Sequence, residues 1–294
     1  MAVLSHAERS RRQSLRAAIS AALAPVALLF LAGCAAPDYS DVDAAGTVVA
    51  IDAKSQTIDW PLNEFGLMVQ DGRTVEHALD LLHSDCAADQ GLEIAFPDRR
   101  RLGDEDSEDR TFGVWNAQWA ARYGFGSPPD SDLKSELLAV GEGFTEAEYQ
   151  IFLDCVDQVA AEHPELDIED RESPSDPAYI GRVLSLETAR ARNDYQAVVA
   201  EWQQCVESVG LTVRKDEPLT ISKGALGTEE QLITAAVADV NCKDQTELVQ
   251  RLANIVGAVQ IAYIDDNRAA LDAQSAQNRA AVEAANVVIA GHGG

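Results

Sequence analysis

Apolar residues recur at three- and four-residue steps along several stretches of this chain, which is the spacing of one buried helix face. From Thr74 this spacing predicts a helix that ends at Gly91, because glycine readily adopts the left-handed conformation that closes many helices. A second helix is predicted from the capping sequence at Thr145 through Cys155 to Glu162. The first half of the chain is therefore expected to be helical.

The second half of the chain predicts longer helices. One spans residues 184–209 and is closed by Gly210. The other spans residues 228–290 as one continuous helix, since no proline interrupts it. Its apolar seam fits either a core helix or a dimerising coiled coil. Beyond Leu271 the seam fades into Ala, Asn and Gln, which indicates a solvated tail.

Shorter patterns set the expected organisation. Residues 47–58 alternate apolar and polar side chains, as in a strand or short hairpin, and residues 34–56 as a whole are assigned to a lipidated N-terminus and tether. A linker rich in Pro and Ser, residues 164–178, separates two helical units at residues 57–163 and 179–294. The predicted fold is mainly α, with a long C-terminal helix and at most a short N-terminal strand or hairpin.

Residues 1–33 have the three-part pattern of an export signal. Four arginines precede an uncharged apolar stretch, and small residues then precede Cys34. A secretory signal carries about 7–15 apolar residues, whereas a membrane-spanning helix needs about 20. Leu31-Ala32-Gly33-Cys34 reads as a bacterial lipobox, which predicts cleavage before Cys34 and lipidation of its thiol. The Arg11-Arg12 pair leaves both the general secretory route and the twin-arginine route open.

The predicted location is the outer face of the cytoplasmic membrane, with the chain held there by a diacylglyceryl group on Cys34. No later segment contains 18 uncharged apolar residues in a row, so we expect no second anchor. The formal net charge of the chain is −26 at pH 7. Because such a surface repels polyanions, nucleic acid is excluded as a partner.

Four cysteines follow Cys34, and an even number of cysteines in an exported chain indicates disulfides rather than a metal site. They allow three pairings. The two halves of the chain echo each other, since each has Cys-x₄-Gly-Leu, then a Thr-Glu helix start and then a second cysteine. This duplicated unit predicts the pairs Cys86–Cys155 and Cys205–Cys242.

Five short motifs follow one another along the chain. They are Trp60-Pro61-Leu62-Asn63-Glu64-Phe65, Cys86-x₄-Gly91, Arg122-Tyr123-Gly124, Trp202-x₂-Cys205-Val206-x₃-Gly210 and Ala238-Asp239-Val240-x-Cys242. Together they resemble uncharacterised secreted lipoproteins of high-GC Gram-positive (actinobacterial) bacteria, over residues 57–268. Asn63, Phe65 and Val206 replace the Asp, Tyr and Met of that pattern. The resemblance implies a disulfide scaffold at the cell surface and implies no catalytic activity.

Several well-known catalytic and phosphate-binding motifs are missing from the sequence. It has no Gly-x-Ser-x-Gly elbow, no His-Glu-x-x-His and no phosphate-binding glycine loop. The acidic clusters at 104–106 and 265–266 lack the spacing of a calcium loop, and Trp115 and Trp119 are expected on one helix face. His77 and His83 are expected on a helix surface. We therefore expect no catalytic residue, no metal and no cofactor.

These patterns favour a non-enzymatic, lipid-anchored envelope protein that binds another envelope component, either a protein or a cell-wall glycan. One alternative is a ligand-binding lipoprotein associated with a transporter. A further alternative is a cell-wall hydrolase that uses His83 or His163 beside a carboxylate.

Overall fold

The structure is a computed structural model that describes residues 38–103, 108–167, 175–224 and 226–293. Within these ranges the chain is mainly helical, with eight α-helices and one two-stranded hairpin. The predicted signal segment, Cys34 and residues 168–174 of the predicted linker lie outside the described residues. No helix in the described ranges is long and apolar enough to cross a membrane.

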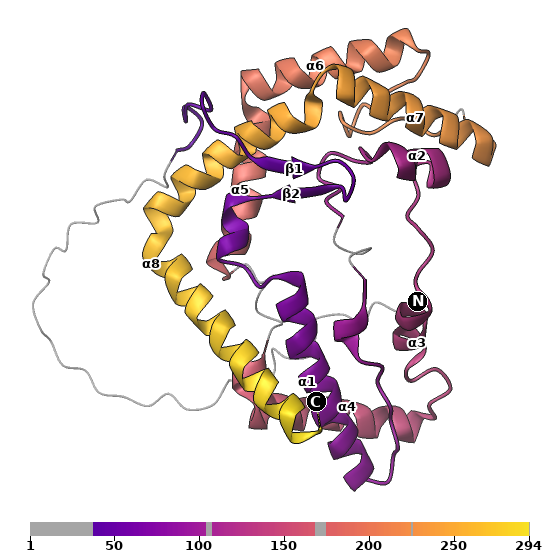
Figure 1. The fold of residues 1–294 in the computed structure, drawn as a ribbon, viewed down its shortest axis with the longest axis vertical. Coiled ribbons are helices and arrows are strands. Elements are labelled where there is room, and N and C mark those ends of the chain that lie inside the picture. The colour runs from indigo at the N-terminus through magenta and orange to yellow at the C-terminus, as the bar shows by residue number, and fades with distance from the viewer. Residues whose placement is uncertain (1–37, 104–107, 168–174, 225, 294) are drawn as a thin grey trace, which may run out of the picture. The chain divides into compact units, whose positions relative to one another are not determined.

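The longest element is α8 (Leu248–Gly291), against which α1 (Val69–Asp89) and α5 (Pro177–Ala191) both pack (Figure 1). Its buried residues occur from the first turn to the last, so this helix has a core-facing side over its whole length. The predicted solvated tail beyond Leu271 is wrong. Ala281 and Ala285 are buried in a cluster with Val75 and Ala78 of α1, because alanine lets two helices approach closely.

The predicted short hairpin is present. Strands β1 (Ala50–Asp52) and β2 (Thr57–Asp59) pair antiparallel, with Ile51 opposite Ile58. Within the range assigned to a tether, Tyr39 and Val49 are buried. The Tyr39 ring packs edge-on against Tyr263 of α8, and its hydroxyl donates to an Asp266 carboxylate oxygen at 3.1 Å. This segment is thus fastened to the long helix.

The predicted helix over residues 184–209 is two helices. Helix α5 begins earlier, at Pro177, and α6 (Asn193–Ser208) follows after Arg192, whose backbone is extended. The Arg192 guanidinium pairs with Asp194 at 2.6 Å and donates to the Val42 carbonyl at 2.6 Å. A tertiary contact to the N-terminal segment therefore accompanies the break.

The predicted continuous helix over residues 228–290 is also interrupted. Helix α7 (Glu229–Gln245) is followed by α8, and Glu247 between them has a φ of +52°, in the left-handed region. The Thr246 hydroxyl donates to the Cys242 carbonyl at 2.8 Å and so satisfies one of the last acceptors of α7. No proline or glycine marks this point in the sequence.

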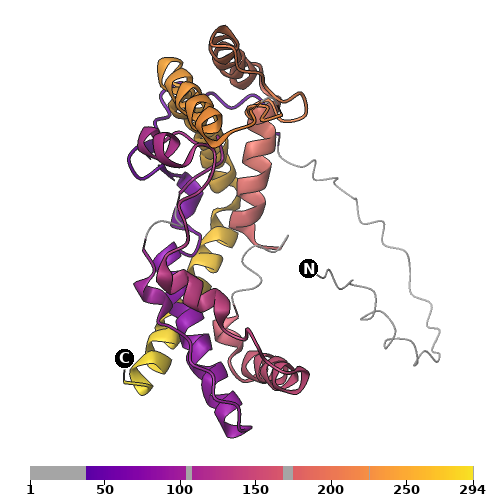
Figure 2. The same ribbon diagram turned by 90° about the vertical axis from the view of Figure 1, so that its right-hand side faces the viewer.

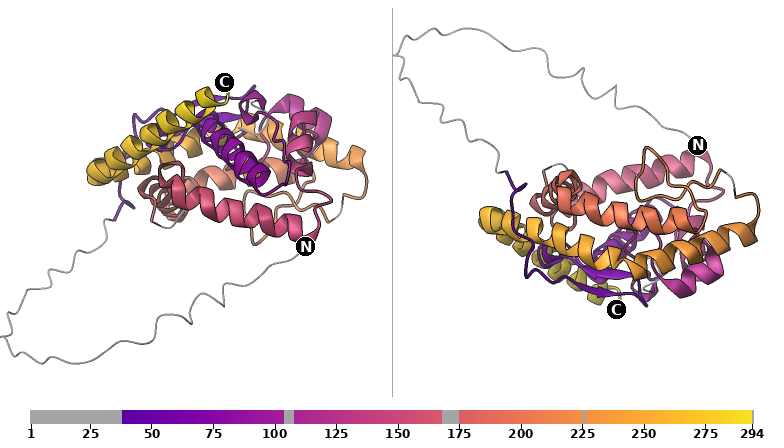
Figure 3. Two further views of the ribbon diagram at one scale, coloured as in Figure 1. Left: turned by 90° about the horizontal axis from the view of Figure 1, so that it is seen from below. Right: turned by 90° about the horizontal axis from the view of Figure 1, so that it is seen from above.

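Both disulfides join the pairs that the internal echo predicts. Cys86–Cys155 links α1 to α4 (Glu146–Glu162), and Cys205–Cys242 links α6 to α7. Helix α1 lies between α8 and α4, as the view from below shows (Figure 3). Two shorter helices, α2 (Ala117–Tyr123) and α3 (Asp132–Ala139), lie in the chain between Cys86 and Cys155. Helix α2 packs beside α7 (Figure 2).

At Gly181, helix α5 lies very close to Tyr263 and Leu62. A Cβ atom at this position would lie 2.5 Å from Tyr263 Cε1 and 2.8 Å from Leu62 Cδ1. We predict that Gly181→Ala lowers the free energy of unfolding by about 1–3 kcal/mol, because overpacking outweighs the gain in helix propensity. Thermal unfolding followed by circular dichroism measures this change. Gly291→Ala, where nothing lies within 4 Å, is the matched control, and equal melting temperatures for both variants would contradict the prediction.

Candidate functional site

An open pocket of about 620 Å³ lies beside the first turn of α6. Its walls come from three parts of the chain, namely residues 110–113, the stretch from Arg190 to Gln203, and residues 216–220. Pockets of about 300–1,000 Å³ hold small molecules or the ends of larger ones. The chemistry of this pocket depends on how those three segments are held in place.

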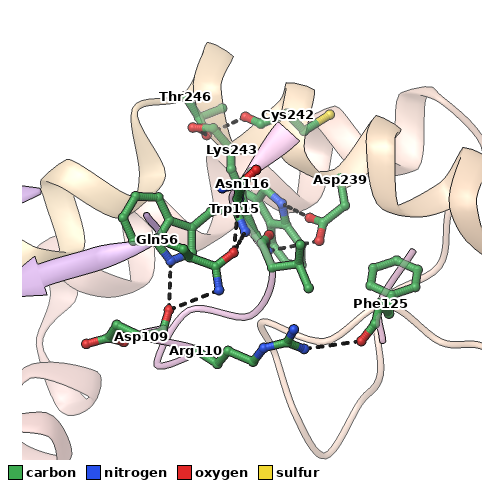
Figure 4. Close-up of polar contacts among 12 residues, drawn as sticks. Gln56, Asp109, Arg110, Trp115, Asn116, Phe125, Asp239, Cys242, Lys243 and Thr246 are labelled. Atoms are coloured by element: carbon green, nitrogen blue, oxygen red, sulfur yellow. Dashed lines mark hydrogen bonds and ion pairs between the residues drawn. The ribbon is translucent and has the colours of Figure 1, made fainter. Parts of the chain in front are cut away.

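Gln56 holds the segment that leads to the first wall. This side chain is completely buried, and its backbone lies in the left-handed region with a φ of +54°. Its Oε1 accepts hydrogen bonds from the backbone N–H groups of Trp115 at 2.9 Å and Asn116 at 3.0 Å (Figure 4). Its Nε2 donates to the Asp109 carbonyl at 3.3 Å. A residue of the β1–β2 turn thus fixes both ends of residues 109–116.

Asp109 and Asn116 complete this arrangement. The indole Nε1 of Trp115 donates to the Asp109 carbonyl at 2.9 Å, and that of Trp60 donates to the Asp109 carboxylate at 2.6 Å. The Asn116 side chain caps α2 by accepting from two backbone N–H groups. Trp115 therefore precedes α2, so the expectation that Trp115 and Trp119 share a helix face is wrong.

Arg110 forms part of the pocket wall, and its guanidinium is fully engaged. Its Nε donates to Glu108 at 2.7 Å, and its Nη2 donates to the Gly126 carbonyl at 2.8 Å. Figure 4 shows the side chain reaching toward the Phe125 carbonyl, to which Nη1 donates at 3.4 Å. Because Glu108 neutralises it, Arg110 positions the loop and offers little free charge to a ligand.

A buried ion pair lies behind the pocket. The Lys243 ammonium donates to Asp239 Oδ2 at 2.9 Å and to the Val114 carbonyl at 2.8 Å. The Trp202 indole donates to Asp239 Oδ1 at 2.9 Å, so the carboxylate is bound on both oxygens. Burial lowers the pKa of Lys243 and raises that of Asp239, and the attraction between them opposes both shifts.

Gly113 lies between this ion pair and the pocket. It lines the pocket, has a φ of +78°, and a Cβ there would lie 3.1 Å from the Lys243 ammonium. Asp239 belongs to one of the five sequence motifs, whereas Lys243 belongs to none. Their four-residue spacing was the available signal, although most charged pairs at that spacing lie on helix surfaces.

The second wall of the pocket is polar. Tyr195 is 4% exposed, and among the described residues its hydroxyl oxygen makes no hydrogen bond of ordinary geometry. Burial raises the pKa of Tyr195, and the neighbouring Arg190 guanidinium lowers it. Gln196 donates to the Arg190 carbonyl at 3.4 Å, and Gln203 donates to the Pro218 carbonyl at 3.2 Å across the pocket. The amide oxygens of these two glutamines accept no hydrogen bond from the described residues.

The third wall carries acidic residues that are already paired. Asp216 lies 2.5 Å and Glu217 lies 3.3 Å from the Arg214 guanidinium. Among the side chains that line the pocket, Arg190 is therefore the cation that no described carboxylate neutralises.

The sequence-predicted residues lie elsewhere. Cys86 and Cys155 are at the far end of α1, and Cys205 and Cys242 staple α6 to α7 without lining the pocket. His77 is 7% exposed rather than on the surface, because it packs beneath Asp98, and burial lowers its pKa. Burial also lowers the pKa of His83, which meets the Phe152 ring edge-on.

Other candidate positions make structural contacts. His163 pairs with Glu165 at 3.2 Å at an exposed site, and Asp266 binds the Tyr39 hydroxyl. Residues 104–107, which include the first acidic cluster, lie outside the described part of the chain. Among the residues that the structure describes, no group of three or more His, Cys, Asp or Glu side chains could hold a metal ion.

Comparisons of the chain with models of protein families, with curated proteins and with solved structures find no match. The chemistry of the pocket is therefore read from its own side chains, which are a guanidinium, a buried phenol and two carboxamides. These groups bind and orient polar ligands by charge and hydrogen bonding.

The buried pair generates a stability prediction. Lys243→Met leaves the Asp239 carboxylate buried without its cation, which lowers the free energy of unfolding by about 3–5 kcal/mol. The double variant Asp239→Leu/Lys243→Met removes both charges and is expected to recover most of that loss. Urea unfolding measures both changes.

Arg251→Met is the control for this measurement. It breaks the exposed Arg251–Glu201 pair and should cost less than about 1 kcal/mol. A Lys243→Met variant as stable as this control would show that the buried pair does not hold the loop.

Proposed function

We propose that this protein is a lipid-anchored, non-enzymatic binding protein of the cell envelope. In this proposal Cys34 carries the lipid, and the folded unit from Asp38 onward presents its pocket to another envelope component. The lipobox sequence and the resemblance to actinobacterial lipoproteins support the location. The two disulfides agree with it, because disulfides persist in oxidising compartments outside the cytoplasm.

The observation that carries the binding role is the pocket beside Tyr195. It is open, it has a volume suited to a small ligand or to the end of a larger one, and the wall at residues 110–113 is held by buried polar contacts. Rigid walls lower the cost of ordering a site when a ligand binds. A loop that served only to connect helices would not need a buried glutamine and a buried lysine to fix its course.

The lining favours binding over hydrolysis. A hydrolase needs a base within hydrogen-bond reach of a nucleophile or water. His83 contacts a phenylalanine ring and His163 pairs with Glu165, and neither lines the pocket. Asp216 and Glu217 both pair with the Arg214 guanidinium, so neither is free to act as that base.

Lipidation is tested by labelling. Cells that express the full chain are fed an alkyne fatty acid, and the protein is then examined for the label. We expect the wild-type chain to be labelled and Cys34→Ala to be unlabelled, because only the Cys34 thiol receives the diacylglyceryl group. The Cys86→Ser/Cys155→Ser variant keeps Cys34 and should stay labelled. An equal label on wild type and Cys34→Ala would contradict the anchor.

Binding through the pocket is tested by filling it. Gln196→Trp adds a large ring at the lining, whereas Gln204→Trp makes the same change at an exposed position of α6 outside the lining. We expect the wild-type chain and Gln204→Trp to bind a soluble cell-wall digest saturably in calorimetry. Gln196→Trp should bind at least about tenfold more weakly, which is 1.4 kcal/mol. Failure of the wild-type chain to bind would remove the basis of the proposed function.

A further inference from the structure

We propose that the pocket binds the carboxylate group of a small ligand, with Arg190 receiving the carboxylate and Tyr195 donating a hydrogen bond to it. This inference rests on the proposed function and narrows it to one ligand chemistry. The proposed ligand carries a single carboxylate and is not a polyanion.

Arg190 is set apart from the other arginines around the pocket. Arg110, Arg192 and Arg214 each form an ion pair with a described carboxylate. Arg190 is exposed, lines the pocket, and among the described residues has no carboxylate within ion-pair distance. A cation in the last turn of α5 also suits the helix dipole. That effect explains the choice of a basic residue but not its place on the wall of a pocket.

Tyr195 supplies the second observation. Its side chain is more than nine-tenths buried, yet its hydroxyl makes no hydrogen bond of ordinary geometry to the described residues. The Arg190 guanidinium acts on the hydroxyl oxygen as a donor, so the hydroxyl proton is left without an acceptor among the described residues. A buried donor without an acceptor costs free energy, which a ligand that accepts this proton would restore. Arg190 and Tyr195 line the same pocket, and the guanidinium lies near enough to lower the pKa of Tyr195 against the effect of burial. A guanidinium and a phenol side by side are suited to the two oxygens of a carboxylate.

The rest of the lining describes the remainder of the ligand. Gln196 and Gln203 use their amide nitrogens on backbone carbonyls, so their oxygens are available to accept from a ligand N–H or O–H. The ligand should therefore carry a carboxylate together with an amide or hydroxyl donor. The end of a short peptide and an acidic sugar both have this chemistry. The formal charge of −26 disfavours a polyanion, because repulsion grows with every added negative group.

Two acids and their uncharged analogues test this inference on the full mature chain in detergent. The peptide arm compares N-acetyl-dialanine with its amide, and the sugar arm compares glucuronate with glucose. Affinity is measured by calorimetry for wild type, Arg190→Gln, Tyr195→Phe and Arg122→Gln. Arg122 is exposed and outside the lining, so its variant is the control for the loss of one positive charge.

We expect at least one acid to bind the wild-type chain at least tenfold more tightly than its uncharged analogue, and the arm that binds identifies the source. Arg190→Gln should remove this preference and Arg122→Gln should keep it. Tyr195→Phe should weaken binding several-fold and leave the melting temperature unchanged. Loss of a hydroxyl that only stabilised the fold would instead lower the melting temperature.

Two results separate failure of the inference from failure of the proposed function. If the cell-wall digest binds and Gln196→Trp blocks it, while neither acid binds or Arg190→Gln has no effect, the carboxylate assignment is overturned and the binding role stands. If neither the digest nor either acid binds the wild-type chain, both are overturned.

Discussion

The buried contact between Lys243 and Asp239 is the constraint on which the pocket end of the molecule depends. One ammonium connects α7 to the carbonyl of Val114, and one carboxylate connects α7 to the Trp202 indole of α6. The disulfide at Cys242 joins the same two helices one residue away. Because burying either charge alone is strongly unfavourable, the three segments must assemble together. The course of residues 109–116, and with it one wall of the pocket, follows from that assembly.

Side-chain amides on α8 hold the N-terminal segment by hydrogen bonding to its backbone groups. Gln260 accepts from the Leu62 backbone at 3.2 Å, Asn254 accepts from the Val49 backbone at 3.0 Å, and Asn278 donates to the Phe65 carbonyl at 3.1 Å. An irregular segment that packs on a helix has backbone groups that need partners, and these side chains supply them. Gly257 and Gly181 then allow close approach. Helix α8 therefore binds the N-terminal segment through hydrogen bonds to its backbone as well as through apolar packing.

Helical periodicity, the cysteine echo and the alternation near residue 50 predicted the helical class, both disulfide pairs and the hairpin. These features are local, or depend on a repeated local pattern. The breaks at Arg192 and Glu247 could not be predicted, because neither residue is a helix breaker, and the break at Arg192 accompanies a contact to the distant Val42 carbonyl. The pocket was missed for a related reason. Arg190 and Tyr195 look ordinary on a helix pattern until residues 110–113 and 216–220 are brought beside them.

The acidity of the chain bears directly on what an arginine in the pocket wall can bind. Acidic residues number 49 against 23 basic residues. Arg110, Arg192 and Arg214 around the pocket each pair with a described carboxylate, whereas Arg73 and Arg122 elsewhere do not. Arg190 instead faces a pocket whose own acids are paired with Arg214. The surrounding negative field opposes the entry of anions, and it does so in proportion to their charge. A site of this kind accepts one carboxylate at short range and rejects polyanions at long range, so selectivity by total charge follows from the composition of the chain.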